Sequence, residues 1–383
     1  MERARFQASA RARTLSRMQA GAAQQFEGAC LALFVFDIGQ SIDLEKSGAR
    51  LSCATHIDAL EHAPIQFQFA RPPLGAKQAC EPLAVGAWRT QPMLELALFE
   101  FGAVSVTYSL PCRGDLGVWT ELSCALAATT VLADAARRRA EQLVVELGDG
   151  IGKPGVAEVS ETYLVFRFGP LAAGVDSDAF VAELAPDLAR LLRSERGALS
   201  AQEIADALGV RVSFQANDLA LIDWNAAAVF DDAPEDVVRV LEFANVELLE
   251  MRFLDAQLDR SLDRAYEMLA RRNWGGRIMS FGLHRDLDRL SSMQVDGAIL
   301  FERVGNTLKL VSDQYLARAL RATSQRFRLG EWNSGILRKL ETLDAIYEKI
   351  HDHAAALRAE FLELIVILLI LLEIVMAFAV NGH

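Results

Sequence analysis

A glycine-rich stretch, GDGIGKPG at residues 148–155, carries the residue types that hold phosphate in nucleotide-binding loops. Such a loop needs four residues between its first glycine and the Gly-Lys pair, and then Ser or Thr to bind magnesium. Here three residues separate Gly148 from Gly152, and Pro154 follows Lys153. We therefore interpret the stretch as a flexible turn between a helix and a strand.

Cys53, His56 and His62 come nearest to a set of metal ligands. Structural metal sites use four ligands, commonly in two closely spaced pairs, and no second pair has suitable spacing. The nucleophile turn of serine hydrolases and the HExxH metalloprotease motif do not occur either. The sequence predicts no catalytic, cofactor-binding or metal-binding residue, and we do not expect an enzyme.

The stretch from Gln314 to Gly330 contains four arginines and no acidic residue. Arg318, Arg321 and Arg328 recur at spacings of three and seven, which places them on one face of a helix. This face is either solvated and balanced by acids on a neighbouring helix, or it contacts an anionic partner. Lipid headgroups and ribosomal RNA phosphates are the two anionic partners considered.

The apolar run from Phe361 to Val380 has the length of a membrane span. Its 20 residues rise about 30 Å as a helix, the thickness of a hydrocarbon core, and only Glu363 and Glu373 interrupt it. A buried core helix is the alternative, but such a helix would normally show a polar face. Because three residues follow the run, we expect a C-terminal transmembrane tail anchor.

Glu373 lies near the middle of this run, where an ionised carboxylate costs a few kcal/mol. Three interpretations remain open. The carboxyl is protonated and hydrogen-bonded to a neighbouring helix of an oligomer, it pairs with a basic residue of another membrane protein, or it is neutral without a function. Glu363, near the headgroups, costs less.

Two apolar seams with alternating spacings of four and three predict long helices packed side by side, within one chain or between chains of a homo-oligomer. The seam residues are Leu241, Leu248, Met251 and Leu258 upstream, and Leu340, Leu343, Tyr347 and Ile350 downstream. Asp255, a polar position in the first seam, is either a register-setting or partner-facing site or a solvated position. Asn333 is a candidate N-cap for the second helix.

The N-terminal half has the period of strands. Residues 31–38, 94–101, 104–110 and 161–168 read as strands, and 210–214 with 219–224 as a hairpin. Helices are expected at 116–147 and 179–192. The predicted fold is an α+β N-terminal domain, then a long-helix, coiled-coil-like bundle and one C-terminal transmembrane helix. The predicted domains are a basic tail (1–28), a head (29–231), a helical stalk (232–360) and an anchor (361–380).

Composition narrows the function class. The net charge of −12 gives no general reason to expect nucleic acid, and we expect no direct DNA binding. The five cysteines include no CxxC pair, which favours buried thiols in a reducing compartment. The Arg-rich first 17 residues are either a solvated basic tail or a mitochondrial import signal.

Three C-terminal stretches resemble the YagE family, an uncharacterised-domain family whose eukaryotic branch is called "required for meiotic nuclear division". They are FERVGNTLKLVSDQYLARALRATSQRF, EWNSGILRKLETLDAIYEKI and LELIVILLILLEIV. LFEFGAVSV, LALIDW and VLEFANVELLEMRFLD add to the resemblance, which spans about Ala32 to Glu373. The resemblance implies membrane-attached oligomers that support translation in mitochondria by holding ribosomes at the membrane, with no established catalytic residue.

These observations predict a tail-anchored, self-associating scaffold that holds a cytoplasmic complex, with the ribosome or another membrane protein as candidate partner. The expected location is the inner membrane of a bacterium with the N-terminal part in the cytoplasm, or else the mitochondrial inner membrane facing the matrix. The alternative function is a membrane-bound enzyme or ligand-sensing protein that uses the α+β head.

Overall fold

The computed structural model of the chain describes residues 24–51, 54–56, 72–270 and 314–381. The described residues form two compact units. Unit 1 contains the residues up to Arg252 together with those from 314 to Gly330. Unit 2 contains the residues from Phe253 to 270 and from Glu331 onward.

Unit 1 is built on a mixed sheet whose described strands lie in the order β11-β12-β13-β10-β1-β8-β7-β4-β3. Neighbouring strands are antiparallel except β10 and β13, which are parallel. The strands are β1 Phe26–Asp37, β3 Ala54–His56, β4 Leu74–Ala79, β7 Met93–Leu98, β8 Ala103–Gly114, β10 Ser160–Phe168, β11 Arg211–Val212, β12 Leu219–Ile222 and β13 Ala226–Phe230. Two short pairs accompany them: β2 Ser41–Ile42 with β9 Ile151–Gly152, and β5 Ala84–Val85 with β6 Trp88–Arg89.

The central strands are buried on both faces. In β1 the even-numbered residues Cys30 to Phe36 join the main core cluster, while Leu31, Leu33 and Val35 are also buried but point to the other face. This explains why the stretch reads as a nearly continuous apolar run and not as an alternating one.

One face of the sheet is covered by helices between Leu44 and Ala207. These helices are α2 Leu44–Arg50, α3 Leu116–Ala127, α4 Val131–Leu147, α5 Ser177–Arg193 and α6 Ala201–Ala207. Trp119 of α3 is fully buried, with its ring 4.6 Å from that of Phe168 in β10. Capping side chains begin four of these helices, because Asp43, Asp115, Asp176 and Ser200 each accept a backbone N–H of the first turn.

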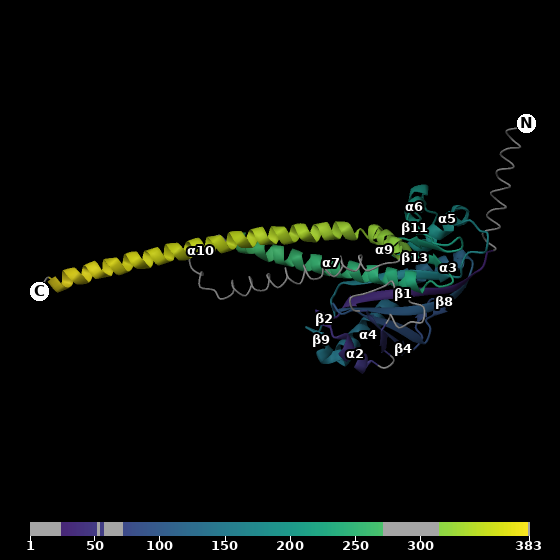
Figure 1. The fold of residues 1–383 in the computed structure, drawn as a ribbon, viewed down its shortest axis with the longest axis horizontal. Coiled ribbons are helices and arrows are strands. Elements are labelled where there is room, and N and C mark those ends of the chain that lie inside the picture. Colours follow the sequence, from purple (N-terminus) through teal and green to yellow (C-terminus); the bar gives the residue numbers. More distant parts are fainter. Residues whose placement is uncertain (1–23, 52–53, 57–71, 271–313, 382–383) are drawn as a thin grey trace, which may run out of the picture. The chain divides into compact units, whose positions relative to one another are not determined.

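The other face is covered by the N-terminal half of α7 (Glu235–Ala270) and by α9 (Gln314–Arg326) (Figure 1). Phe243 of α7 packs on Phe99, with ring centroids 6.4 Å apart, and Phe327 after α9 packs on Tyr163 at 5.4 Å. Unit 1 is therefore a sheet between two helical layers.

The GDGIGKPG stretch is a turn between a helix and a strand. It forms the end of α4, the short helix η2 (Gly148–Gly150) and strand β9. Gly152 O accepts the amide of Gln40 at 2.8 Å.

A Cβ on Gly102 would lie 1.7 Å from Gly39 O, so the β7–β8 turn requires a glycine there.

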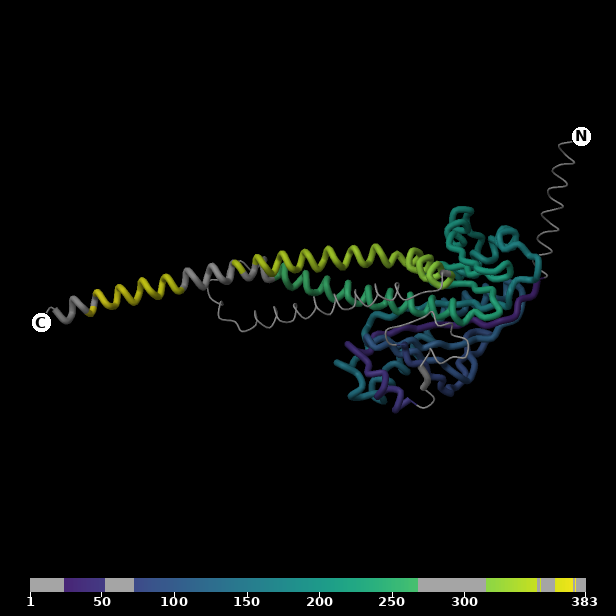
Figure 2. The backbone as a smooth tube through the Cα atoms, viewed as in Figure 1, coloured from purple at the N-terminus to yellow at the C-terminus, as the bar shows by residue number. Residues whose placement is uncertain are grey.

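Unit 2 contains the C-terminal half of α7 and most of α10 (Leu329–Asn381), side by side in Figure 2. Lys339 of α10 pairs with Asp255 and Asp259 of α7, each at 2.6 Å. Leu258 of α7 and Leu343 of α10 are buried. The two predicted seams therefore meet within one chain here, and Asp255 has an intrachain partner.

The predicted seam residues divide between the two units. In unit 1, Leu241 and Met251 are buried and Leu248 is half-buried; in unit 2, Leu258 and Leu343 are buried, Leu340 and Tyr347 are half-buried, and the side chain of Ile350 lies outside the description. The first seam thus begins as a layer of the head. The units divide within α7, whereas the predicted boundary lay near its start.

The prediction of an α+β N-terminal domain followed by a helical C-terminal region is confirmed. The N-cap prediction at Asn333 is wrong, because α10 begins at Leu329. The predicted helix at 116–147 is two helices, broken at residues 128–130.

Candidate functional site

The C-terminal end of α9 lies in a cluster of charged side chains drawn from four parts of unit 1. Arg326 donates from Nε to Asp223 Oδ1 at 3.1 Å and from Nη2 to Asp206 Oδ2 at 2.8 Å. Arg193 of α5 approaches the same two acids, with its Nε 2.7 Å from Asp223 Oδ2. Two arginines thus enclose two aspartates.

Because the cluster is partly buried, it connects the C-terminal end of α9 firmly to the rest of unit 1. Asp223 is 1% exposed, and the side chain of Arg326 is 11% exposed. The hydrogen bond from Arg326 lowers the pKa of Asp206 to about 2, with Arg193 adding to the effect. Removing one member would leave a buried charge without compensation, which costs more than the pair itself contributes.

Aromatic rings surround the charges. The Tyr163 hydroxyl donates to Asp223 O at 2.9 Å. Trp224 is 39% exposed, and the guanidinium carbons of Arg326 and Arg328 both lie 5.3 Å from its ring centroid. Together these contacts fix the segment that follows α9.

The predicted basic face is placed as follows. Arg318 is exposed and donates to Ser213 O at 3.3 Å, and Arg321 is exposed. Arg328 is also exposed but lies beyond the end of α9 in the left-handed conformation, with φ 54°, so it does not continue the helical face. Arg326 was not among the predicted site residues. Because it is two residues from Arg328, it was expected to lie off the predicted basic face, which was only a weak indication of its role.

An exposed ring stands beside this face. Phe214, in the loop between β11 and β12, is 67% exposed, and its ring centroid lies 5.5 Å from that of Tyr315 in α9. The buried Asp218 carboxylate accepts the backbone amides of Phe214 at 2.7 Å and Gln215 at 2.9 Å. The loop is therefore held in the conformation that exposes the ring.

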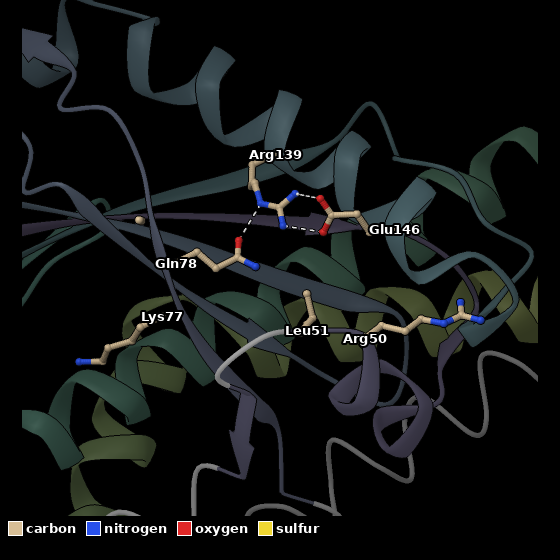
Figure 3. Close-up of a pocket in the computed structure, with 7 residues that line it drawn as sticks. Arg50, Leu51, Lys77, Gln78, Arg139 and Glu146 are labelled. Carbon is tan, nitrogen blue, oxygen red and sulfur yellow. Dashed lines mark hydrogen bonds and ion pairs between the residues drawn. The ribbon is translucent and has the colours of Figure 1, made fainter.

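A second feature of unit 1 is an open cleft of about 740 Å³ between α2, β4 and α4, shown in Figure 3. Arg139 lies between Gln78 Oε1 at 2.9 Å and Glu146, whose two oxygens it reaches at 2.9 and 2.7 Å. Lys77 pairs with Glu95, and Arg50 with Asp149. Because each cation among the described lining residues has an acidic partner, these residues offer no unpaired cation to a ligand.

A third feature is the apolar part of α10. Between Leu362 and Ile374 every side chain is exposed, including eleven leucines, isoleucines and valines with exposed fractions of 37% to 62%. Glu363 and Glu373 are exposed as well. The nine consecutive apolar residues from 364 to 372 cover all sides of the helix, so no polar face exists there.

Within the part of the chain that the structure describes, no single helix qualifies as a membrane span. The bent pair α3 and α4, at 54°, passes by length and composition alone. In α10 the longest unbroken run of described apolar side chains, residues 364–372, is shorter than a bilayer-spanning helix.

One buried carboxyl lacks a compensating charge. Glu247 of α7 is 3% exposed, and its Oε2 has no hydrogen-bond partner in the described residues. Burial raises the pKa of this carboxyl to about 8. A carboxyl with this pKa is mostly protonated, and therefore neutral, at neutral pH. Its titration therefore reports on the packing around α7.

Over the described ranges, no group of three or more His, Cys, Asp or Glu side chains is arranged to hold a metal ion. Of the metal-ligand candidates weighed above, Cys53 and His62 lie outside the described residues, and His56 belongs to β3.

Residues 27–236 match the family described as "Uncharacterized protein MJ0711, N-terminal domain", which is more than half of the 383 residues. The chain belongs to this family. Uncharacterized protein MJ0711 of Methanocaldococcus jannaschii is 24% identical over 241 residues, which are 62% of this chain and 72% of the relative. No solved structure matches significantly.

The resemblance to the YagE family is therefore wrong. The matched region spans the strands of the unit 1 sheet, from β1 to β13, and ends at the start of α7. The YagE resemblance depended mainly on long helices near the C-terminus, and no comparison indicates that family. What it implied about mitochondrial translation no longer has family support.

Proposed function

We propose that the protein is a membrane-attached scaffold, in which α10 inserts into a bilayer and carries the α+β head. One observation carries the proposal: the apolar side chains of α10 between Leu362 and Ile374 are exposed on all sides of the helix. In water such a surface is strongly unfavourable, whereas in a hydrocarbon layer it is solvated.

The magnitudes favour insertion in spite of the glutamate. On an insertion scale the eleven exposed apolar residues contribute about −3 to −7 kcal/mol in total. An acidic residue near the centre of a span costs about 3 kcal/mol, less if it lies nearer the interface or is neutral. Glu373 therefore reduces the stability of the inserted helix without preventing insertion.

Flotation of the purified full-length chain with phospholipid vesicles on a density gradient tests this proposal. The test variant is Leu364→Lys/Leu368→Lys/Leu371→Lys. Three lysines add roughly 8 to 10 kcal/mol, more than the apolar run contributes. The matched control is Val118→Lys/Val131→Lys/Val145→Lys, which places lysines at three exposed valines of the head.

We expect the wild type and the control to float and to resist extraction by alkaline carbonate, and the recovery of the α10 variant with vesicles to fall at least tenfold. Wild-type chain that stays at the bottom of the gradient would contradict the proposal. So would equal flotation of all three proteins.

We also propose self-association and a bound partner complex, without specifying their interfaces. Part of the predicted seam is occupied within the chain by the pairing of Lys339 with Asp255, so an oligomer would use other surfaces of the helices or the inserted part. A ribosome as the tethered complex, the cytoplasmic orientation and the alternative of an enzyme or ligand-sensing head stay predictions.

A further inference from the structure

We propose that α9 and the β11–β12 loop, residues 213–218, form a binding surface for single-stranded nucleic acid. The inference does not depend on membrane attachment, because every residue that carries it lies in unit 1. We name this the α9 surface and define it by Phe214, Tyr315, Arg318, Arg321 and Arg328.

The cations of the α9 surface are displayed to the outside. No acidic residue occurs between Gln314 and Gly330, and Arg318, Arg321 and Arg328 are exposed. Arg326 is turned inward and its charge is compensated by Asp206 and Asp223. The inward arginine fixes the helix end, while the exposed side chains of Arg318, Arg321 and Arg328 lie where phosphate groups can approach them.

The exposed aromatic ring of Phe214 distinguishes the α9 surface from an ordinary solvated basic face. A large apolar side chain that is 67% exposed is costly, yet the buried Asp218 carboxylate holds the loop so that the ring stays outside. Tyr315 supports one side of the ring at 5.5 Å. An aromatic ring held rigidly next to arginines is the arrangement on which unstacked bases bind.

A second aromatic group lies where the basic segment ends. Trp224 is 39% exposed and is flanked by the guanidinium groups of Arg326 and Arg328. The basic segment thus has a partly exposed aromatic ring near each end. Lipid headgroups or an acidic peptide would use the arginines but would not need the rings, so single-stranded nucleic acid is the partner that uses the whole surface.

The net charge of −12 shapes the expected behaviour. Long-range repulsion weakens association, so the interaction should be local and sensitive to salt. With about three phosphates contacted, the logarithm of the binding constant should fall against the logarithm of salt concentration with a slope of about −2. Removing one arginine should reduce that slope by about 0.7.

Fluorescence anisotropy of a labelled short single-stranded oligouridine, titrated with the full-length chain in detergent micelles, tests the proposal. The variants are Phe214→Ala and Arg321→Gln, with Tyr266→Ala and Arg338→Gln as matched controls, since these also change an exposed aromatic and an exposed arginine. Thermal unfolding of each variant confirms that the head is folded.

We expect Phe214→Ala to weaken binding about tenfold at every salt concentration, and Arg321→Gln to weaken it and lower the salt slope, while the controls bind as the wild type does. Absence of wild-type binding at low salt overturns the proposal. Equal losses in the controls overturn it as well. A third outcome is that anionic vesicles displace the oligouridine while Phe214→Ala leaves oligouridine binding unchanged. In that case the arginines bind lipid headgroups, and the proposal is also wrong.

Discussion

The head and the C-terminal part of α10 place the same apolar residue types in opposite surroundings. In the head, Leu33 and Phe166 are 1% and 0% exposed because helices cover both faces of the sheet. In α10, Leu368 and Leu371 are 60% and 61% exposed. Apolar residues in the head are the interior of a fold, whereas those in α10 have no covering element among the described residues. This contrast is what the proposed insertion of α10 into a bilayer would explain.

The largest expected effect is the loss of stability when an apolar side chain of the head is removed, and it tests this contrast. Trp119→Ala removes a fully buried ring that packs on Phe166 and Phe168, and it should lower the free energy of unfolding by about 3 to 5 kcal/mol. Leu371→Ala in α10 should leave the unfolding of the head unchanged. Urea denaturation followed by tryptophan fluorescence, with a second probe for two-state behaviour, measures both; equal effects would remove the distinction between the regions.

The charge cluster gives the next effect. Asp223→Asn leaves Arg193 and Arg326 undercompensated in a partly buried site, and it should destabilise the head by about 2 to 3 kcal/mol. Asp178→Asn, which removes a solvent-exposed partner of Arg211, is the control and should cost less than about 0.5 kcal/mol. A neutral result for Asp223→Asn in thermal unfolding would show that the cluster does not fix α9.

Glu247 gives an effect that depends on pH. The pKa of this carboxyl rises from 4.5 in the unfolded chain to about 8 in the fold, so between these values the folded state binds more protons. The stability of the head should therefore fall as pH rises through this window, by at most about 1.4 kcal/mol per pH unit. Glu247→Gln should reduce the slope and gain about 1 to 2 kcal/mol near the upper end of the window. Part of the slope should remain, because burial also raises the pKa of Asp37 to about 7.

Denaturation at several pH values measures the slope, and Glu158→Gln, at an exposed glutamate, is the control. A slope that is unchanged in Glu247→Gln would mean that this carboxyl is ionised in the fold through contacts outside the described residues.

The smallest effect concerns the helix pair of unit 2. Lys339→Ala removes two partly exposed ion pairs with Asp255 and Asp259, and it should cost about 0.5 to 1 kcal/mol. Hydrogen exchange of the peptides around these acids should increase, whereas Arg338→Ala, at an exposed neighbour, should leave it unchanged. If Lys339→Ala instead changes the oligomeric state, the helices pair between chains.

Much of the head could be predicted from its sequence, because strands β1, β7, β8 and β10 are rich in branched and aromatic residues between clear turns. Strand β13, AAAVF, was missed since alanine has little strand preference, and its place is set by parallel pairing with β10. The β7–β8 turn contains Gly102, whose φ of 109° favours glycine.

The charge cluster could not be predicted, because Arg326 is more than 100 residues from Asp206 and Asp223 in the sequence, and the packing of α9 on the sheet brings it to them. The basic face was predicted in part. Arg318 and Arg321 follow the helical period, but the period does not reveal that α9 ends before Arg328.

The family prediction failed for a related reason. Long helices rich in leucine, glutamate and arginine look alike in many unrelated proteins, since the same spacing of apolar residues serves any helix pair. The family match instead covers residues 27–236, the region of the strands of the unit 1 sheet.

The depth of Leu368 in a bilayer tests the central claim most directly. A fluorophore on Leu368→Cys, in a variant whose native cysteines are serine and whose head still unfolds cooperatively, is reconstituted with lipids that carry quenchers at the bilayer centre or at the headgroups. Val145→Cys in the head is the control. If α10 is inserted, the central quencher should act most strongly on residue 368, and neither quencher should act on residue 145. Quenching of residue 368 by neither lipid, or by the headgroup quencher alone, would contradict insertion of α10.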